Sequence, residues 1–169
     1  APVRLAKSGI GDMIGKYIAL ADWRIANILT KEFLCETIFS LTESATDAVL
    51  KSAKGIATGE SDAYEKLMYG LLLSGLAMQM MGNSRPASGA EHHISHFIEM
   101  EPVKLGIHSD ALHGEKVGVG TLLAIREYQR LATLNNINFK DYKTFDETEI
   151  LRVFGNEKLT EILDENKND

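Results

Sequence analysis

Apolar residues recur at intervals of three and four along most of this sequence, and this spacing is the feature that most constrains the fold. Between Ser8 and Leu29 the apolar positions follow such a period: Ile10, Ile14, Tyr17, Ile18, Ala21, Ile25 and Ile28. A helix returns to one face every 3.6 residues, whereas a half-buried strand alternates at every second residue. No alternating stretch and no internal repeat is found. The sequence therefore predicts an all-α fold, a multi-helix bundle.

The three prolines support this prediction because each stands where a helical pattern begins or has ended: Pro2, Pro86 and Pro102. Proline is tolerated in the first turn of a helix but breaks a helix interior. Two Ser/Thr-x-x-Glu pairs have capping-box spacing, Ser88 with Glu91 and Thr144 with Glu147. After the first helix we expect helices over 32–53 with a stop near Gly55, over 62–81, from Ser88 towards Pro102, from His113 or Gly114 to Leu134, from Thr144 to Gly155, and over 156–163.

The stretch 62–81 is apolar on nearly all sides, which predicts the central helix of the bundle. Gly70 and Gly75 interrupt it, and we expect both to allow close helix packing. Its methionines, at 78, 80 and 81, are expected to fill the core.

Length and composition indicate one soluble globular domain over 1–163 with a polar tail over 164–169. The chain has 169 residues, 44% of them hydrophobic and 25% charged, with a net charge of -6. Its basic residues are scattered, which argues against a nucleic-acid partner, and no apolar run reaches the roughly 20 residues of a membrane span. The single cysteine, Cys35, excludes a disulfide framework and fits a cytoplasmic location. The chain starts at Ala1, which we interpret as a piece of a longer protein.

All five histidines lie between His92 and His113. His92 and His96 are four positions apart on a predicted helix, so both rings leave one face and could meet a metal ion or a substrate. The glutamate of a His-Glu-x-x-His motif is absent, and surface histidines at this spacing are common. His113 begins a new helix beside Gly114, and Asp12 could complete a three-ligand site with an open position. A first-turn acid interacting with the helix dipole is the simpler interpretation of Asp12 alone.

Two basic residues are candidates for binding an anion. Arg85 precedes the helix at Ser88, where its guanidinium together with free N–H groups of Ser88 and Gly89 would suit a phosphate or carboxylate. Lys16 follows Asp12 by one turn and would add positive charge to the same face. Solvated surface positions are the simple alternative for both. Asp22 and Trp23 are interpreted first as a surface interaction and a packing residue.

Three ordered motifs together resemble a known family: Ser8-Gly-Ile-Gly-Asp12-Met-Ile-Gly-Lys16, Ser84-Arg-Pro-Ala-Ser-Gly-Ala-Glu-His92-His-Ile-Ser-His96, and Leu112-His113-Gly-Glu-Lys-Val-Gly118. They look like the C-terminal half of bacterial-type sn-glycerol-1-phosphate dehydrogenases, within the superfamily of iron-containing alcohol dehydrogenases, glycerol dehydrogenases and dehydroquinate synthases. The resemblance covers nearly the whole chain.

The resemblance implies a helical metal-binding domain that normally follows an α/β domain, with NAD or NADP between them. It implies metal ligands at Asp12, His92 and His113, with His96 lining the substrate and nicotinamide pocket. Zinc and nickel both accept such ligands. The implied reaction is reduction of dihydroxyacetone phosphate to sn-glycerol 1-phosphate, with His96 or a water at the metal passing the proton.

The chain holds no strand followed by a Gly-x-Gly-x-x-Gly turn, so we expect no dinucleotide fold in it and no activity of the isolated piece. Within the superfamily, a glycerol dehydrogenase or a dehydroquinate synthase is the alternative. The motif around Arg85 favours a phosphorylated substrate and therefore a glycerol-1-phosphate dehydrogenase. Outside it, a metal-dependent phosphohydrolase lacks the expected His-Asp doublets, and an inactive helical module remains the simplest alternative. Homo-oligomer formation is left open.

Overall fold

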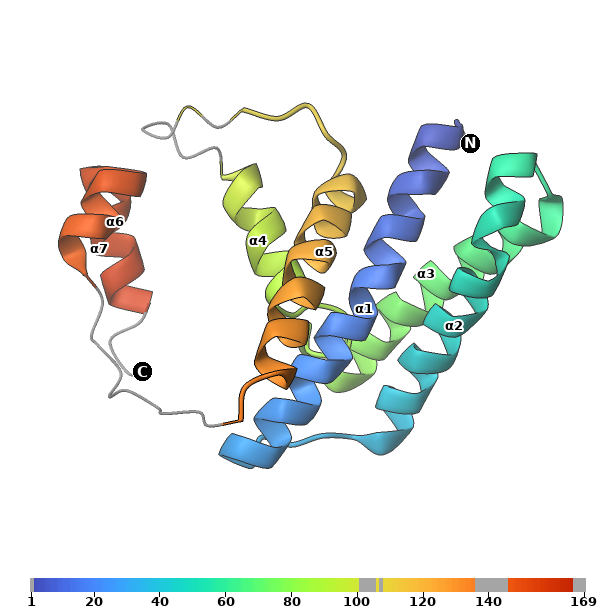
Figure 1. The fold of residues 1–169 in the computed structure, drawn as a ribbon, viewed down its shortest axis with the longest axis horizontal. Coiled ribbons are helices and arrows are strands. Elements are labelled where there is room, and N and C mark those ends of the chain that lie inside the picture. The colour runs from blue at the N-terminus through green and yellow to red at the C-terminus, as the bar shows by residue number, and fades with distance from the viewer. Residues whose placement is uncertain (1, 101–105, 107, 136–145, 166–169) are drawn as a thin grey trace.

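The computed structural model describes residues 2–100, 106, 108–135 and 146–165, and these residues form seven helices and no strand. The all-α prediction is thereby confirmed (Figure 1). The helices are α1 (Val3–Thr30), α2 (Glu36–Thr58), α3 (Ser61–Met81), α4 (Ala90–Glu99), α5 (His113–Ala132), α6 (Glu147–Phe154) and α7 (Asn156–Glu165). None of these described helices is both long enough and apolar enough to cross a membrane.

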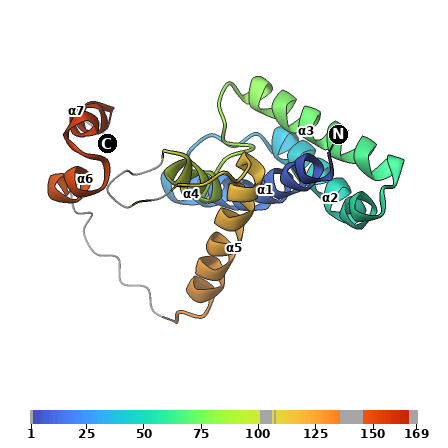
Figure 2. The same ribbon diagram turned by 90° about the horizontal axis from the view of Figure 1, so that it is seen from above.

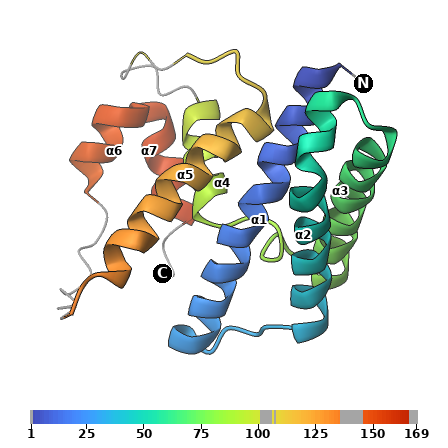
Figure 3. The same ribbon diagram turned by 45° about the vertical axis from the view of Figure 1, so that its right-hand side comes forward.

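The central helix is α1, with α5 and α4 packed on one side and α2 and α3 on the other (Figures 1 and 3). The prediction that 62–81 occupies the centre is wrong. Helix α3 packs mainly on α2 through a face of mostly small residues, on which Gly70 approaches Val49 closely, as expected. A Cβ atom on Gly75 would meet none of the described residues within 4 Å, so the close packing expected at this glycine is not found there. Leu67 of α3 is buried, but five other large apolar residues of this helix face outwards, including Met80, which the sequence predicts in the core: Met68, Tyr69, Leu72, Leu76 and Met80.

Helix α1 begins at Val3, five residues before the expected start. The carbonyl of Pro2 accepts hydrogen bonds from the N–H groups of Leu5 and Ala6, at 3.0 and 3.3 Å. Proline fixes the backbone that precedes the first turn and does not need its missing N–H there. Asp12 therefore lies in the interior of α1, and the interpretation of Asp12 as a first-turn acid is wrong.

Helix α2 starts at Glu36 and continues past Gly55, where the sequence indicated a stop. A Cβ atom on Gly55 would lie 2.8 Å from the Cβ of Ala63, so this glycine permits close packing against the start of α3. The helix ends at Gly59, whose φ of 80° is the left-handed conformation that glycine adopts easily.

Helix α4 starts at Ala90 and not at a Ser88 capping box. The backbone N–H of Ala90 donates to Asp22 Oδ2 at 2.7 Å, so a carboxylate of α1 caps α4. The other Asp22 oxygen accepts a hydrogen bond from the Tyr128 hydroxyl of α5. Burial, together with this carboxylate, raises the pKa of Tyr128. Asp22 therefore connects three helices and is not the surface residue that the sequence indicated, whereas Trp23 is buried as expected.

Helix α5 begins at His113 as expected and ends at Ala132, two residues before the expected Leu134, and its apolar residues are divided between two faces. Val117 is buried, whereas Leu122 is 63% exposed. Helices α6 and α7 form a pair beyond α4 and α5 (Figure 2), which meets α4 through the rings of Phe97 and Phe154, 6.0 Å apart. Helix α6 ends before Gly155, as predicted. Its N-cap is Asp146, and the expected cap at Thr144 lies outside the described residues.

Candidate metal centre

Three residues far apart in the sequence meet at one point of the bundle. Asp12 comes from the interior of α1, His92 from the first turn of α4, and His113 is the first residue of α5. His92 Nε2 lies 3.3 Å from Asp12 Oδ1, and His113 Nε2 lies 3.8 Å from the same oxygen. One ligand atom from each residue lies within 4.8 Å of the other two, which is close enough for all three to hold one ion.

Glycines beside two of these residues allow the close approach. A Cβ atom on Gly11 would lie 2.2 Å from the carbonyl oxygen of Gly114, and one on Gly114 would lie 1.8 Å from the carbonyl oxygen of Ser8. The backbones of α1 and α5 therefore touch, as a glycine without a Cβ atom at each position allows. Because Asp12 follows Gly11 and His113 precedes Gly114, this contact brings Asp12 and His113 together.

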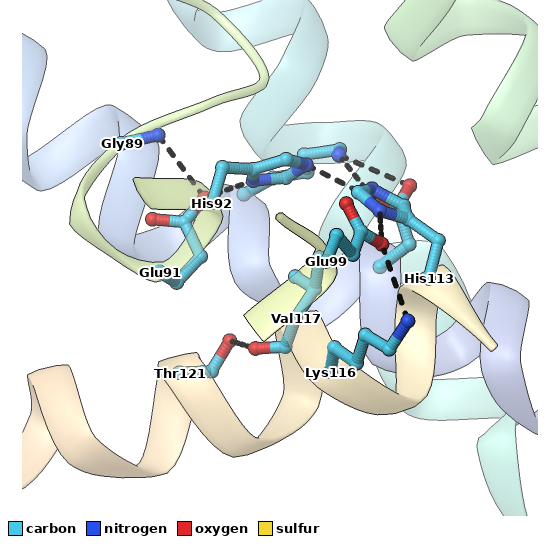
Figure 4. A network of polar contacts seen from close by, with 10 residues as sticks. Gly89, Glu91, His92, Glu99, His113, Lys116, Val117 and Thr121 are labelled. Carbon is cyan, nitrogen blue, oxygen red and sulfur yellow. Dashed lines mark hydrogen bonds and ion pairs between the residues drawn. The ribbon is translucent and has the colours of Figure 1, made fainter. Parts of the chain in front are cut away.

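The Nδ1 atom of each of these two histidines contacts a glutamate carboxylate (Figure 4). His92 Nδ1 lies 2.7 Å from Glu91 Oε1, and His113 Nδ1 lies 2.8 Å from Glu99 Oε1. If Nδ1 carries the hydrogen and donates it to the carboxylate, Nε2 presents a lone pair towards Asp12. Histidines that bind metals usually have such a partner, which fixes the ring orientation and the tautomer.

The sequence did not point to either glutamate. Glu91 was assigned to a capping box, and adjacent helical positions do not normally face each other. Glu99 and His113 lie on different helices with no spacing rule to connect them. Glu91 is 0% exposed, and this burial is the feature that distinguishes it from an ordinary surface glutamate. The burial follows from the packing of α1, α4 and α5, which local sequence patterns do not reveal.

Lys16 is buried and is not the solvated lysine of the simple interpretation. It lies on the Asp12 face of α1 as expected, with Nζ 3.0 Å from both Asp12 oxygens and only 3% of the residue exposed. Burial acts to raise the pKa of Asp12, but the hydrogen bond with His92 and the charge of Lys16 outweigh it and lower this pKa to about 2. Burial acts to lower the pKa of His92, but hydrogen bonds with Asp12 and Glu91 outweigh it and raise this pKa. Asp12 is therefore ionised at neutral pH, as a metal ligand must be.

The cluster opens into a cavity of about 410 Å³ between α1, α3, α4 and α5. The His96 ring lies on this cavity, with its centre 6.0 Å from that of His92 and 6.1 Å from that of His113. The lining residues are Asp12, Lys16, Leu71, Ser74, Gly75, Met78, Ser84, Ala87, Ser88, His92, His96 and His113. An apolar groove of about 470 Å³ between α2 and α3 is larger, but it contains none of the residues that converge here.

Arg85 lies in a neighbouring cavity of about 460 Å³, which shares Ser84, Ser88 and His96 with the first. Its guanidinium donates two hydrogen bonds of 2.6 Å to Glu32, so Arg85 is paired. The expectation of free N–H groups at Ser88 and Gly89 is wrong. The Ser88 N–H donates to the carbonyl of Ser84 and the Gly89 N–H to Glu91.

Fold and site together define a class: a helical domain that presents one carboxylate and two imidazoles as a candidate metal centre beside a cavity. Comparison with known proteins is more specific, although no family model matches the chain. The chain is 38% identical to a glycerol-1-phosphate dehydrogenase (NAD(P)+) of Geobacillus thermodenitrificans over 168 residues, which cover 97% of the chain and 41% of the relative. It is also 42% identical over 131 residues to that of Bacillus licheniformis, covering 78% of the chain and 32% of the relative.

An archaeal relative extends the comparison: the glycerol-1-phosphate dehydrogenase (NAD(P)+) of Pyrococcus horikoshii is 36% identical over 140 residues, 83% of the chain and 37% of the relative. The chain is homologous to the C-terminal part of glycerol-1-phosphate dehydrogenases. It spans about two fifths or less of the length of the curated relatives described here.

Proposed function

We propose that this chain is the metal- and substrate-binding domain of an NAD(P)-dependent oxidoreductase that reduces dihydroxyacetone phosphate to sn-glycerol 1-phosphate. The observation that carries the proposal is the convergence of Asp12, His92 and His113 at the wall of a cavity, in a chain homologous to glycerol-1-phosphate dehydrogenases. The domain is assigned to 1–163 and the polar tail to 164–169, although α7 continues through Asp164 and Glu165.

The three residues fit a divalent transition-metal ion. Two imidazole nitrogens and one carboxylate oxygen form a donor set that zinc and nickel both accept, and three protein ligands leave room for substrate. When bound, the ion supplies Lewis-acid polarisation of the substrate carbonyl. Asp12, His92 and His113 would hold this ion, and Lys16 would add positive charge beside an anionic substrate.

The two cavities share Ser84, Ser88 and His96, which supports one substrate that extends from the first cavity into the second. Its carbonyl end would lie near Asp12 and its phosphate end near Ser88 and Arg85. Arg85 uses Nε and one terminal nitrogen on Glu32, and a guanidinium has five N–H donors, so donors remain for an anion. His96 lines both cavities, and we assign to it contact with the substrate and the nicotinamide and donation of the proton that completes the alcohol.

The hydride comes from NAD or NADP. The described residues contain no strand and therefore no strand–turn–helix unit of the kind that binds a dinucleotide pyrophosphate. We assign cofactor binding mainly to a nucleotide-binding region outside these residues, and the choice between NAD and NADP to that region. A cytoplasmic location accords with the proposal.

Binding of dihydroxyacetone phosphate to the Zn²⁺-loaded chain tests the substrate assignment. We expect dihydroxyacetone phosphate to bind at least about tenfold more tightly than uncharged dihydroxyacetone, because a charge-assisted hydrogen bond contributes about 1.5–3 kcal/mol. Arg85→Ala should remove most of this difference. Isothermal titration calorimetry measures both affinities.

The matched control is Arg24→Ala, since Arg24 makes a similar two-bond contact with Glu36 away from both cavities. It should leave both affinities unchanged. Equal binding of the two ketones by the wild-type chain would contradict the phosphate assignment and favour a glycerol dehydrogenase.

Turnover tests the assignment of the hydride. The 169-residue chain, loaded with Zn²⁺ or Ni²⁺, is expected to show no oxidation of NADH or NADPH with dihydroxyacetone phosphate, followed by absorbance at 340 nm. In the enzyme that includes the nucleotide-binding region, His96→Ala should lower kcat by about 10²-fold and alter its pH profile, as loss of a proton donor does. Turnover by the 169-residue chain alone would contradict the assignment of cofactor binding to a region outside the described residues. An unchanged kcat and pH profile in His96→Ala would contradict the assignment of His96 as the proton donor.

A further inference from the structure

Glu91 is a fully buried carboxylate in contact with a candidate metal ligand. It is 0% exposed, and its Oε1 atom lies 2.7 Å from His92 Nδ1 and accepts a 3.1 Å hydrogen bond from the Gly89 N–H. Its Oε2 atom is buried and has no hydrogen-bond partner among the described residues. An unpaired buried oxygen of a charged group is costly to folding, so stability alone gives no reason for a glutamate here.

The surroundings of Glu91 hold it in one place. A Cβ atom on Gly15 of α1 would lie 3.1 Å from Glu91 Cγ, and one on Gly120 of α5 would lie 2.3 Å from the Glu91 carbonyl oxygen. Two glycines of neighbouring helices thus make room for this residue and leave it little freedom to move. The carboxylate is a fixed acceptor on one side of the His92 ring.

We propose that Glu91 is a positioning residue, which keeps the hydrogen of His92 on Nδ1 and so leaves the Nε2 lone pair for the ion. The inference rests on the proposed metal site at Asp12, His92 and His113. Nε2 is the His92 atom that faces Asp12, at 3.3 Å. Free histidine favours the opposite tautomer, with the hydrogen on Nε2, which cannot bind a metal through that atom.

Glu99 contacts His113 Nδ1 in the way that Glu91 contacts His92 Nδ1, but the pair of Glu99 and His113 is more exposed to solvent. The Glu99 side chain is 29% exposed and that of His113 is 46% exposed, so water can replace the carboxylate as an acceptor. The His92 ring is 9% exposed and rests against protein, which makes Glu91 the partner that cannot be replaced.

Zn²⁺ affinity, measured by competition with a chromophoric chelator, tests the proposal. Glu91→Met, which is similar in length and cannot accept this hydrogen bond, should weaken Zn²⁺ binding by about 10–100-fold, the usual effect of losing the partner of a metal-bound histidine. Glu91→Gln keeps an acceptor oxygen and should lose less than Glu91→Met. Glu127→Met, at an exposed position of α5 paired with Arg130, should bind Zn²⁺ like the wild type.

A second measurement reports the position of the hydrogen itself. In ¹⁵N spectra of the metal-free chain at mildly alkaline pH, the protonated fraction of His92 Nδ1 should be higher in the wild type than in Glu91→Met, in which the hydrogen moves towards Nε2 and the Asp12 carboxylate. Melting temperatures are recorded beside these spectra, because an apolar side chain in place of a buried charge often leaves folding intact.

Wild-type Zn²⁺ affinity in Glu91→Met, or an unprotonated His92 Nδ1 in the wild type, would overturn the proposal while leaving the metal site in place. If Glu91→Met does not fold, the spectrum of the wild type and the affinity of Glu91→Gln decide. If the wild type binds no Zn²⁺, the proposed metal site fails, and the spectrum still decides whether Glu91 fixes the tautomer.

Discussion

Replacing His92 or His113 with alanine is expected to abolish stoichiometric Zn²⁺ binding, with affinity falling by well over about 100-fold. Losing only the partner behind a ligand already weakens binding by about 10–100-fold, so losing a ligand must have a larger effect. Metal content after dialysis and chelator competition measure this loss. His113→Ala should leave folding nearly intact, because the His113 side chain is 46% exposed.

His93→Ala is the matched control for these variants. His93 lies beside His92 on the same helix, is exposed, and lines the Arg85 cavity instead of the cluster. It should bind Zn²⁺ like the wild type. Asp12→Ala should lose Zn²⁺ too, but it also leaves the buried ammonium of Lys16 without its carboxylate and should lower stability. Wild-type metal content in all three ligand variants would refute the site and favour an inactive helical module.

Replacing Gly114 with alanine is expected to destabilise the fold by about 3 kcal/mol or more, at the upper end of what overpacking costs. The new methyl group would lie 1.8 Å from the Ser8 carbonyl oxygen, which is backbone and cannot rotate away. Helices α1 and α5 would have to separate, and Asp12 would move away from His113. Urea unfolding followed by circular dichroism measures the stability, and chelator competition measures the Zn²⁺ affinity.

Gly118→Ala is the matched control, one turn later on the same helix. Among the described residues outside its own helix, a Cβ atom on Gly118 would meet only the Gly11 Cα atom, at 3.8 Å, which is an ordinary contact. Alanine should therefore stabilise the chain by roughly 0.5–1 kcal/mol through its helix propensity. Equal unfolding midpoints for the two variants would show that the backbones of α1 and α5 do not touch as described.

Local patterns predicted the helices well because period, proline and glycine act over a few residues. Two of the errors arise where a residue of another helix decides. Helix α4 begins at Ala90 because Asp22 of another helix caps it, and Gly55 lies inside α2 because Ala63 packs against it. Helix α3 looked central because its composition is apolar, but composition does not reveal which face the neighbouring helices cover.

The candidate site was predicted in part. The three motifs pointed to Asp12, His92 and His113, and the structure brings these residues together. The spacing places Lys16 on the Asp12 face, but it does not predict that Lys16 is buried there or that Arg85 is paired with Glu32. Arg85 and Glu32 lie in two different connections between helices, and Lys16 is buried only because other helices cover it, so both features follow from the packing of the whole bundle.

The contact between Gly11 and Gly114 has a consequence for how an ion would act on the chain as a polymer. Asp12, His92 and His113 come from three helices separated by long stretches of sequence. An ion shared by all three would be a reversible cross-link that closes two large loops, placed where the backbones of α1 and α5 already meet. Since only the folded chain brings the three ligands together, the stability gained would rise with the logarithm of free ion concentration.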